Sequence, residues 1–571
     1  MNVEKIDAII SDLTERLKAQ RKKGQMWRGE LSSSAISTSV AAFALHKIDA
    51  ERYRQRIDQA VEWLLSTMAE DGSWGDSPES PSNMTATLLS YTSLYAQGRA
   101  PEQTKRYLER RFGGIDDEHI VRGVLEYYGK DLTFSVPILV MCALAGILKK
   151  WDRIPQFPFE LTILPQRFFR FLQLPVVSYA IPALIAVGIV RFRRGKQGIF
   201  SPVREAFVPK CMRVLTSLQP ENGGFLEAAP LTAFVSMCLC EADMREHTVV
   251  RKAAEFLYDT QREDGAWPID TDLASWVTAL AVKALGEDTE ERELLTEKIR
   301  SNAFKQKHYF TGAQAGGWGW SDRPGAAPDG DDTSGALVAL HTLSRGKYCD
   351  EVGAGVEWLM ALQNNDGGMP TFCKGWGKLP FDRSSADISA HALLAMELWM
   401  DHLPEKIQRR AKRSIERMIG WMSREQAEDG SWTPLWFGDQ AADDERSPVY
   451  GTATAVEYLS QSKNEAVGPL IERGAKFLTG AQNDDGGWGG ARGVESKVTL
   501  TARALSALAS IESADREVVE RGFDYIYRAW QRGDMYRAEP IGLYFARLWY
   551  SEPMYNMTFV LMAMKKLKNL I

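Results

Sequence analysis

Three carboxylic acids lie within four positions of the segment 329–334, whose sequence is Asp-Gly-Asp-Asp-Thr-Ser. Like charges this close cannot all ionise freely, so the pKa of at least one of them should be raised. A glycine- and tryptophan-rich run at 316–320 precedes the segment, and an apolar run at 336–340 follows it. A carboxylic acid that keeps its proton among aromatic side chains can act as a general acid. The alternative is a solvated loop or a helix N-terminus, which favours negative charge.

The composition describes an ordinary globular protein and excludes some functional classes. The chain has 571 residues, too many for one ordinary domain, and 44% of them are hydrophobic. A net charge of −6 argues against a nucleic-acid partner, which would require a basic face. The six cysteines lack Cys-x-x-Cys spacing, which disfavours a disulfide framework or a zinc knuckle and indicates a reducing compartment. The first residues form an amphipathic run without a signal-peptide core, so we expect a cytoplasmic protein.

One local pattern recurs: an apolar helix end, a glutamine, and a glycine-containing turn that ends in an aromatic residue. It occurs at 68–74, 219–225, 261–267, 363–369, 426–432 and 482–488, with a less regular copy at 314–318. The first copy lacks the glutamine, and Met369 replaces the aromatic residue of the fourth. Where copies follow one another directly, as at 219–225 and 261–267, the spacing is roughly 40–65 residues, which is typical of repeated helical hairpins.

Each part of this pattern has a physical role. Glycine accepts the left-handed backbone that ends a helix. We expect the glutamine to bond loose backbone groups at helix ends and the tryptophan to pack under the next helix. A helical solenoid without any chemistry would have the same repeat.

The segments between these turns indicate helices. Apolar residues recur at three- and four-residue steps, for example in 251–261, 351–363 and 469–482, and alternating strand patterns are scarce. We therefore predict an all-α protein whose paired helices close into barrels. We expect one domain to consist of residues 1–28 and 271–571, which carry the acidic segment, and a second domain to consist of residues 29–270.

Residues 151–195 interrupt the repeat and are rich in proline and large apolar side chains. The run 174–190 is uncharged and precedes the sequence Arg-Phe-Arg-Arg at 191–194. It is short for a membrane span, and prolines interrupt it. A buried core helix explains this composition, and so does an apolar face that dips into a membrane with its arginines at the head groups.

Together these motifs resemble a known family. The segment 329–334 resembles the Asp-x-Asp-Asp-Thr-Ala motif of class II terpene cyclases, and the turns resemble the Gln-Trp repeats of squalene-hopene cyclases. Residues 151–161 resemble the stretch before the substrate channel of those enzymes. The resemblance covers nearly the whole chain. It implies two (α/α) barrel domains with a large aromatic cavity between them. It also implies a monotopic enzyme that takes an apolar polyene from the membrane surface, and it is compatible with a homodimer.

Members of this family protonate a terminal alkene, and the folded chain then closes through a cascade of carbocations. The resemblance assigns the proton donor to Asp331 and its flanking partners to Asp329 and Asp332. His391 corresponds to the histidine that hydrogen-bonds the donor. Asp387 lies four residues earlier on the same helix face and corresponds to the carboxylate that orients and charges this histidine. Taken alone, His391 would more often be a core histidine.

The chemistry requires these residue types. An alkene is a very poor base, so the donor must be a strong acid that still holds its proton when the substrate arrives. Neighbouring carboxylates keep the donor protonated, and a cationic histidine stabilises the carboxylate that forms when the donor gives up its proton. The faces of aromatic rings stabilise later cations without bonding to them. The resemblance assigns the following aromatic side chains to the cavity: Tyr179, Trp276, Trp320, Phe372, Trp436, Tyr450 and Tyr544.

The predicted substrate is a linear polyprenyl chain, either squalene-like or shorter and attached to an aromatic group. The shorter chain fits because an insertion at 439–447 departs from the squalene enzymes and the segment 541–550 resembles diterpene-type cyclases. The sequence lacks an Asp-Asp-x-x-Asp magnesium motif, so we expect no metal and no cofactor. Asp332 follows Asp331 where epoxide-opening sterol cyclases carry cysteine, which favours an alkene as the target.

Two other functions remain open. A relative of the protein-prenyltransferase β-subunit would share the barrel but would need Asp, Cys and His ligands for zinc, and no cysteine of this chain stands in an obvious set of that kind. A non-catalytic isoprenoid-binding barrel would bind the substrate without forming a product.

Overall fold

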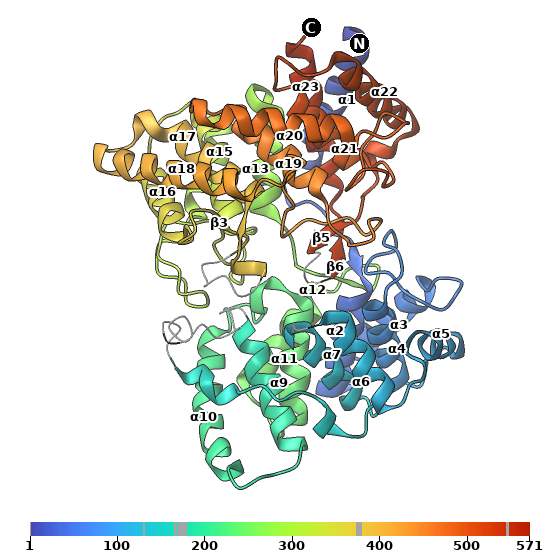
Figure 1. Cartoon of the computed structure of the whole chain (residues 1–571). Coiled ribbons are helices and arrows are strands. Elements are labelled where there is room, and N and C mark those ends of the chain that lie inside the picture. Colours follow the sequence, from blue (N-terminus) through green and yellow to red (C-terminus); the bar gives the residue numbers. More distant parts are fainter. Residues whose placement is uncertain (1, 130–131, 165–167, 169–179, 373–379, 544–546) are drawn as a thin grey trace. The chain divides into compact units, whose positions relative to one another are not determined.

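The computed structural model describes residues 2–129, 132–164, 168, 180–372, 380–543 and 547–571 (Figure 1). The described chain is mostly helical, which confirms the prediction of an all-α protein. Its contacts divide it into two compact units. Unit 1 comprises Met1–Glu30, Asp272–Asp322 and Ala327–Ile571, and unit 2 comprises Leu31–Thr271 and Arg323–Ala326.

Unit 1 is a double ring of helices. Each inner helix packs against the next, and the last returns to the first, so the ring closes. The inner helices are α13 (Ala274–Leu285), α15 (Gly330–Ser344), α17 (Ala386–Trp399), α19 (Pro448–Leu459), α21 (Val498–Leu508) and α23 (Pro553–Asn569). Outside them lie α1 (Val3–Gln20), α14 (Arg292–Ser301), α16 (Asp350–Leu362), α18 (Glu405–Glu425), α20 (Gly468–Ala481) and α22 (Arg516–Arg532).

The residue pattern decides which helices are inner and which are outer. In α18 the buried residues Ile415, Met418 and Met422 recur at three- and four-residue steps, and charged side chains cover the other faces. By contrast, α15 is buried on nearly every face, since its small and apolar residues meet neighbours all round. An amphipathic helix can cover the ring, whereas a helix that is apolar all round must lie within it.

Unit 2 repeats this plan. Its inner helices α2, α4, α7, α9 and α11 pack in sequence, and α11 returns to α2. They span Ala35–Asp49, Met84–Ala96, Leu132–Leu144, Ile181–Arg194 and Ala229–Glu241. The outer helices are α3 (Arg54–Ser66), α5 (Glu102–Phe112), α6 (Asp117–Tyr128), α10 (Ser201–Leu218) and α12 (Thr248–Thr260).

The apolar run before the arginines is partly described. Helix α9 carries Ile181–Val190 inside unit 2, where its side chains are buried on all faces. The core-helix interpretation therefore holds for this part of the run, and its residues are not available to a membrane. Residues 174–179 lie outside the described residues.

Short antiparallel strand pairs and single-turn helices fill the connections. In unit 2, β1 (Ser33–Ser34) pairs with β2 (Trp267–Pro268). In unit 1, β3 (Met369–Pro370) pairs with β4 (Ser384–Ser385), and β5 (Ile541–Leu543) with β6 (Leu548–Tyr550). The 3₁₀ helices lie at Trp151–Arg153, Phe159–Ile163, Phe225–Glu227, Gly286–Asp288, Pro380–Asp382, Met400–His402, Glu465–Val467 and Asp534–Tyr536.

The recurring turn joins neighbouring hairpins through its glutamine. After α18, Nε2 of Gln426 donates to the Gly430 carbonyl of its own turn at 2.9 Å and to the Leu470 carbonyl of α20 at 3.0 Å. Gln482 does the same for Gly486 and the Val518 carbonyl of α22. Each glutamine thus satisfies a backbone group of the next outer helix, as predicted.

The tryptophan of the turn has two anchors. The Trp488 indole N–H donates to the Leu478 carbonyl of the preceding α20 at 2.8 Å, and its backbone N–H donates to Thr501 Oγ1 of the following α21 at 2.9 Å. The side chain therefore packs beneath the next inner helix, as expected, and also bonds to the helix before it. Gly486 adopts φ +88°, which a side chain would strain.

Loss of one glutamine bridge should weaken unit 1. We expect Gln426→Met to lower the free energy of unfolding by about 1–3 kcal/mol, because two buried carbonyls lose their donors. Chemical denaturation followed by circular dichroism measures this loss. Gln531→Met, at an exposed position of α22, is the control and should change the free energy by less than about 0.5 kcal/mol. Equal stability of the two variants would contradict the bridging role.

Candidate active site

The acidic segment forms the N-terminus of α15. Asp329 is the N-cap, and its Oδ1 accepts the backbone N–H groups of Asp331 and Asp332, both at 2.9 Å. The preceding tryptophan turn holds this cap, since the Trp318 carbonyl accepts the Asp329 N–H at 3.1 Å. The Trp318 N–H in turn donates to Thr333 Oγ1 at 3.0 Å. The structural repeat therefore fixes where the acids lie.

Asp329 and Asp332 form a buried acid pair. Burial raises the pKa of Asp329 to about 6, and burial together with the Asp329 charge raises the pKa of Asp332 well above its ordinary range. A hydrogen bond joins the Asp332 and Asp329 carboxyl groups, and two adjacent buried carboxyls disfavour the ionisation of both. The expectation that crowding raises the pKa of at least one of these acids is met by Asp329 and Asp332.

Asp331 turns away from this pair and meets His391 on the neighbouring helix α17. Its Oδ1 lies 2.6 Å from His391 Nδ1. The Asp331 side chain is 24% exposed, whereas that of His391 is 3% exposed. Burial lowers the pKa of His391, and the bond to Asp331 only partly offsets this effect. The structure thus joins the two residues that the resemblance pairs, with the acid on the open side.

An aromatic ring holds the imidazole in place. The Tyr458 ring of α19 stacks on His391 with centroids 4.4 Å apart and planes only 6° from parallel, and Trp276 of α13 meets it edge-on at 6.3 Å. These contacts fix the ring plane, so Nδ1 points at Asp331. Sequence reasoning missed Tyr458, although it follows Tyr450 by two four-residue steps on one helix face.

The expected role of Asp387 needs a correction. Among the described residues, no hydrogen bond joins Asp387 to His391. Asp387 instead accepts a hydrogen bond from Ser385 Oγ in the strand before α17. Burial raises the pKa of Asp387 to about 6, with a smaller contribution from the Asp331 charge. A four-residue helical step places two side chains on one face, but it does not make them bond.

A small pocket opens beside Asp331. Trp276 and Tyr450, two of the predicted cavity aromatics, lie in its wall, and so does Asp387. The other lining residues were not predicted: Leu280, Ile388, Thr454, Tyr458, Arg503 and Phe559. Every inner helix of unit 1 contributes to this wall.

Three more predicted aromatics form a row. Phe372 lies between Trp320 and Trp436, with ring centroids 5.9 Å apart on both sides. The Trp320 carbonyl accepts the Trp276 N–H at 3.2 Å, which ties the row to the pocket wall. Tyr179 and Tyr544 lie outside the described residues.

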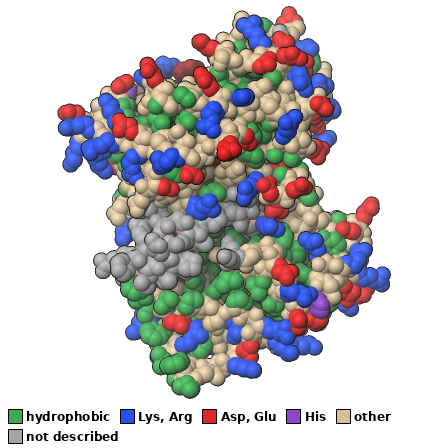
Figure 2. Space-filling view, viewed as in Figure 1, with side chains coloured by type: hydrophobic (Ala, Val, Ile, Leu, Met, Phe, Trp, Pro, Cys, Tyr) green, Lys and Arg blue, Asp and Glu red, His purple; other side chains and the backbone are tan. Residues whose placement is uncertain are grey.

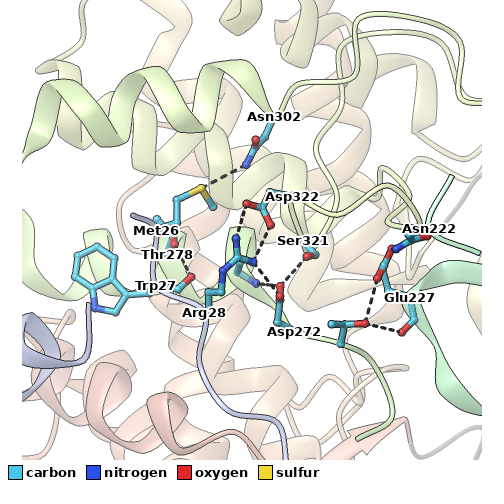
Figure 3. A network of polar contacts seen from close by, with 12 residues as sticks. Met26, Trp27, Arg28, Asn222, Glu227, Asp272, Thr278, Asn302, Ser321 and Asp322 are labelled. Carbon is cyan, nitrogen blue, oxygen red and sulfur yellow. Dashed lines mark hydrogen bonds and ion pairs between the residues drawn. The ribbon is translucent and has the colours of Figure 1, made fainter. Parts of the chain in front are cut away.

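Ion pairs hold the segments that flank α13 (Figure 3). In unit 1, Arg28 binds Asp322 through two parallel hydrogen bonds of 2.9 Å and Asp272 through a third of 2.9 Å. Ser321 Oγ donates to Asp272 at 2.7 Å, next to Trp320. A bidentate pair of this kind is directional, so it fixes the chain that carries Trp320.

In unit 2, Glu227 anchors the loop Arg323–Ala326. Its carboxylate accepts Asn222 Nδ2 at 2.6 Å and the Gly325 N–H at 2.7 Å, and Figure 3 includes the first of these bonds. Burial raises the pKa of Glu227, although these donors offset part of the effect. The loop ends at Ala326, three residues before the N-cap Asp329.

Within the described ranges, no group of three or more His, Cys, Asp or Glu side chains is arranged to hold a metal ion.

Comparison with known proteins identifies two matching family models. The model described as "Squalene-hopene cyclase C-terminal domain" matches residues 273–569, and "Squalene-hopene cyclase N-terminal domain" matches residues 10–112. The first covers more than half of the chain and includes the acidic segment and His391.

Individual relatives are distant. The chain is 24% identical to Enfumafungin synthase of Hormonema carpetanum over 88% of its own length and 44% of that protein. A terpene cyclase-glycosyl transferase fusion protein of Humicola fuscoatra gives the same values, so the chain spans less than half of these two relatives. Squalene–hopene cyclase of Zymomonas mobilis is 21% identical and is matched over 91% of this chain and 89% of its own.

The fold also occurs in a solved structure. The ent-copalyl diphosphate synthase of Streptomyces platensis superposes with a TM-score of 0.55 at 17% identity, covering 99% of both chains. At this identity the likeness concerns the fold alone.

The contact between Asp331 and His391 can be tested without a substrate. We expect Asp331→Asn to lower the pKa of His391 further, because the variant removes the carboxylate that favours the charged imidazole. A pH titration of ¹³C-histidine-labelled protein, with His391 assigned from the spectrum of His391→Gln, measures this pKa. Asp515→Asn, at the N-cap of the outer helix α22, is the control and should leave the titration unchanged. An unchanged His391 titration in Asp331→Asn would contradict the pairing.

Proposed function

Because the chain belongs to the squalene-hopene cyclase family, we propose that it cyclises a linear polyprenyl substrate to a fused polycyclic terpenoid, beginning with proton transfer from Asp331. The observation that carries this proposal is the 2.6 Å contact between Asp331 Oδ1 and His391 Nδ1 beside a pocket with aromatic walls. This site combines the partly exposed carboxyl group of Asp331, the buried imidazole of His391 that orients it, and aromatic rings that can face a cation.

The first step uses the two oxygens of Asp331 differently. Oδ1 accepts the N–H of His391, and Oδ2 carries the proton. As this proton forms a C–H bond with one carbon of the terminal alkene, the π electrons supply that bond and the other carbon becomes a cation. The electron pair of the broken O–H bond stays on Asp331, where the His391 N–H stabilises the new carboxylate.

The flanking acids preserve the geometry of this step. Asp329 holds the backbone of Asp331 through the N-cap, and its hydrogen bond with Asp332, which disfavours the ionisation of both, limits the negative charge beside the donor. A less negative surrounding makes Asp331 a stronger acid, because a neighbouring anion disfavours the carboxylate product.

The cascade then proceeds against aromatic surfaces. Trp276, Tyr450 and Phe559 line the pocket around the donor, and the faces of their rings can stabilise a tertiary cation without capturing it. Each internal alkene attacks the preceding cation and forms a ring bond. The last cation is discharged by loss of a proton or by a nucleophile. The substrate is squalene-like, or a shorter polyprenyl chain on an aromatic group, because both end in the alkene that Asp331 would protonate.

Activity with defined substrates tests this proposal. We expect Asp331→Asn to reduce turnover by about 10²–10⁴-fold, the contribution of general acid catalysis, with unchanged helical circular dichroism. Mass spectrometry of products from squalene and from prenylated aromatic acids measures turnover. Asp515→Asn again serves as the control and should retain full activity.

The outcome also separates the alternatives. Full turnover by Asp331→Asn would refute the assignment of the donor. Tight substrate binding by the wild type without any product would favour a non-catalytic isoprenoid-binding barrel. Stoichiometric bound zinc would favour the prenyltransferase-like function.

We also propose that unit 2 attaches to the surface of a membrane. Exposed apolar side chains gather where α10 begins: Ile199 is 93% exposed, Phe200 75% and Val203 56%. Figure 2 shows hydrophobic side chains grouped on this part of unit 2. Arg194 and the highly exposed Lys196 flank these residues and can meet anionic head groups. In the described part of the chain, no helix has the length and apolar character needed to span a bilayer.

Membrane binding can be measured directly. We expect the double variant Ile199→Glu and Phe200→Glu to lose most of its co-sedimentation with vesicles of phosphatidylcholine and phosphatidylglycerol, because it replaces the most exposed apolar surface with negative charge. Tyr95→Glu, another exposed aromatic position of unit 2, is the control. Equal sedimentation of wild type and the double variant would rule out this attachment surface.

A further inference from the structure

A cluster of charged side chains adjoins Tyr458, the ring on which His391 stacks. The side chains of Glu457 and Arg503 are buried, whereas those of Lys283 and Lys566 are 15% and 24% exposed. Glu457 of α19 is fully buried, and its Oε1 accepts Lys283 Nζ of α13 at 2.9 Å and Lys566 Nζ of α23 at 3.2 Å. Its Oε2 accepts Arg503 Nη1 of α21 at 2.6 Å. Three cations therefore share one carboxylate, which leaves a surplus of positive charge inside the helical ring.

This surplus charge adjoins the site. Arg503 lines the pocket together with Asp331, and its Nη2 donates to Thr454 Oγ1 at 2.6 Å. Lys283 Nζ lies 4.2 Å from the centroid of the Tyr458 ring, on which His391 stacks at 4.4 Å. The Tyr458 ring therefore contacts both the lysine and the imidazole.

Stability alone does not explain the cluster. One cation would neutralise Glu457, and each further buried charge costs desolvation energy that the structure must offset. Replacing such a group with an apolar side chain is often neutral or stabilising. The arrangement is better explained by the electrostatic potential that it creates at the neighbouring Asp331–His391 pair.

The charged and titratable groups around His391 define that potential. Asp331 of α15 and Asp387 of α17 face the pocket, and Glu457 faces the cluster. The remaining groups are Tyr450 and Tyr458 of α19, Lys283 of α13, Arg503 of α21 and Lys566 of α23. After burial and the opposing contribution of Asp331, the charges of Lys283 and Arg503 also lower the pKa of His391.

We propose that Lys283 and Arg503, anchored on Glu457, are positioning residues that keep His391 a neutral hydrogen-bond donor and stabilise the carboxylate that Asp331 becomes. The catalytic half of this inference rests on the function proposed above. It differs from the sequence-based expectation of a cationic histidine, because it assigns the stabilising positive charge to the cluster beside Tyr458.

Lys283 is the residue to test, because its charge can be removed while Arg503 and Lys566 still hold Glu457. Burial lowers the pKa of Lys283 to about 8, so the cluster should lose one positive charge as the pH rises through this value. Lys283→Met removes the charge at every pH, and Lys283→Arg keeps it at every pH. Lys565→Met is the matched control on α23, since that lysine binds Leu285 and Asp288 instead of Glu457.

We expect Lys283→Met to raise the pKa of His391 in the histidine NMR titration and to lower kcat about tenfold, with KM unchanged, because a nearby charge acts on proton transfer and not on binding. Wild-type kcat should fall as the pH rises through about 8. Lys283→Arg should restore the His391 titration and remove this alkaline loss. Lys565→Met should match the wild type in all respects.

The same His391 titration in Lys283→Met and Lys565→Met, with intact circular dichroism, would overturn the inference. If Lys283→Met fails to fold, Glu457→Gln provides an opposite test, since removal of the carboxylate that the three cations share should lower the pKa of His391 further. An inactive wild type would refute the proposed function, yet the NMR titration would still decide whether the cluster controls His391.

Discussion

Unit 1 must keep three carboxylic acids at the end of one buried helix without letting all of them ionise. Water screens charges poorly at a buried helix end, so each carboxyl group must be stabilised by a partner of its own. Asp329 accepts two backbone N–H groups as the N-cap, Asp332 keeps a proton and donates it to Asp329, and Asp331 bonds to His391. The three arrangements depend on one another, because moving any one carboxyl group would leave a buried charge without a partner.

The double ring of helices supplies the rigidity that this arrangement requires. Asp331 and Asp387 both lie in the first turn of their inner helices. Each of the inner helices α13, α15, α17, α19 and α21 is followed by an outer one that returns the chain, so these inner helices begin at the same end of the ring. Their N-termini carry partial positive charge, which favours carboxylates there. The repeated Gln-Trp turns hold these helix ends in place, which makes the repeat part of the chemistry as well as of the fold.

Two kinds of positive charge matter at this site: the side-chain cations of the Glu457 cluster and the carbocation of the proposed reaction. The cluster favours the carboxylate that Asp331 becomes, but it would repel a carbocation in the pocket. Ring faces in the pocket wall offset that repulsion, because an aromatic quadrupole attracts a cation without offering it a lone pair. The Tyr458 ring contacts both Lys283 and His391, so it links the two regions.

The chain's pattern alone determined the helical class, the turns and the acidic segment, because glycine caps, buried tryptophans and helical periodicity are local properties. It also determined that Asp331 and His391 belong together, although only through a family resemblance. Only the tertiary structure decided that Tyr458 holds the imidazole, that Asp387 bonds to Ser385, and that the charges of Glu457 and Arg503 meet. Apart from Ser385 and Asp387, which are neighbours in the chain, these residues come from different helices. The same charged cluster joins Lys283 to Glu457, 174 positions away. Sequence periodicity describes neighbouring residues and cannot predict contacts over such a separation. Only the closure of the helical ring brings its first inner helix beside its last.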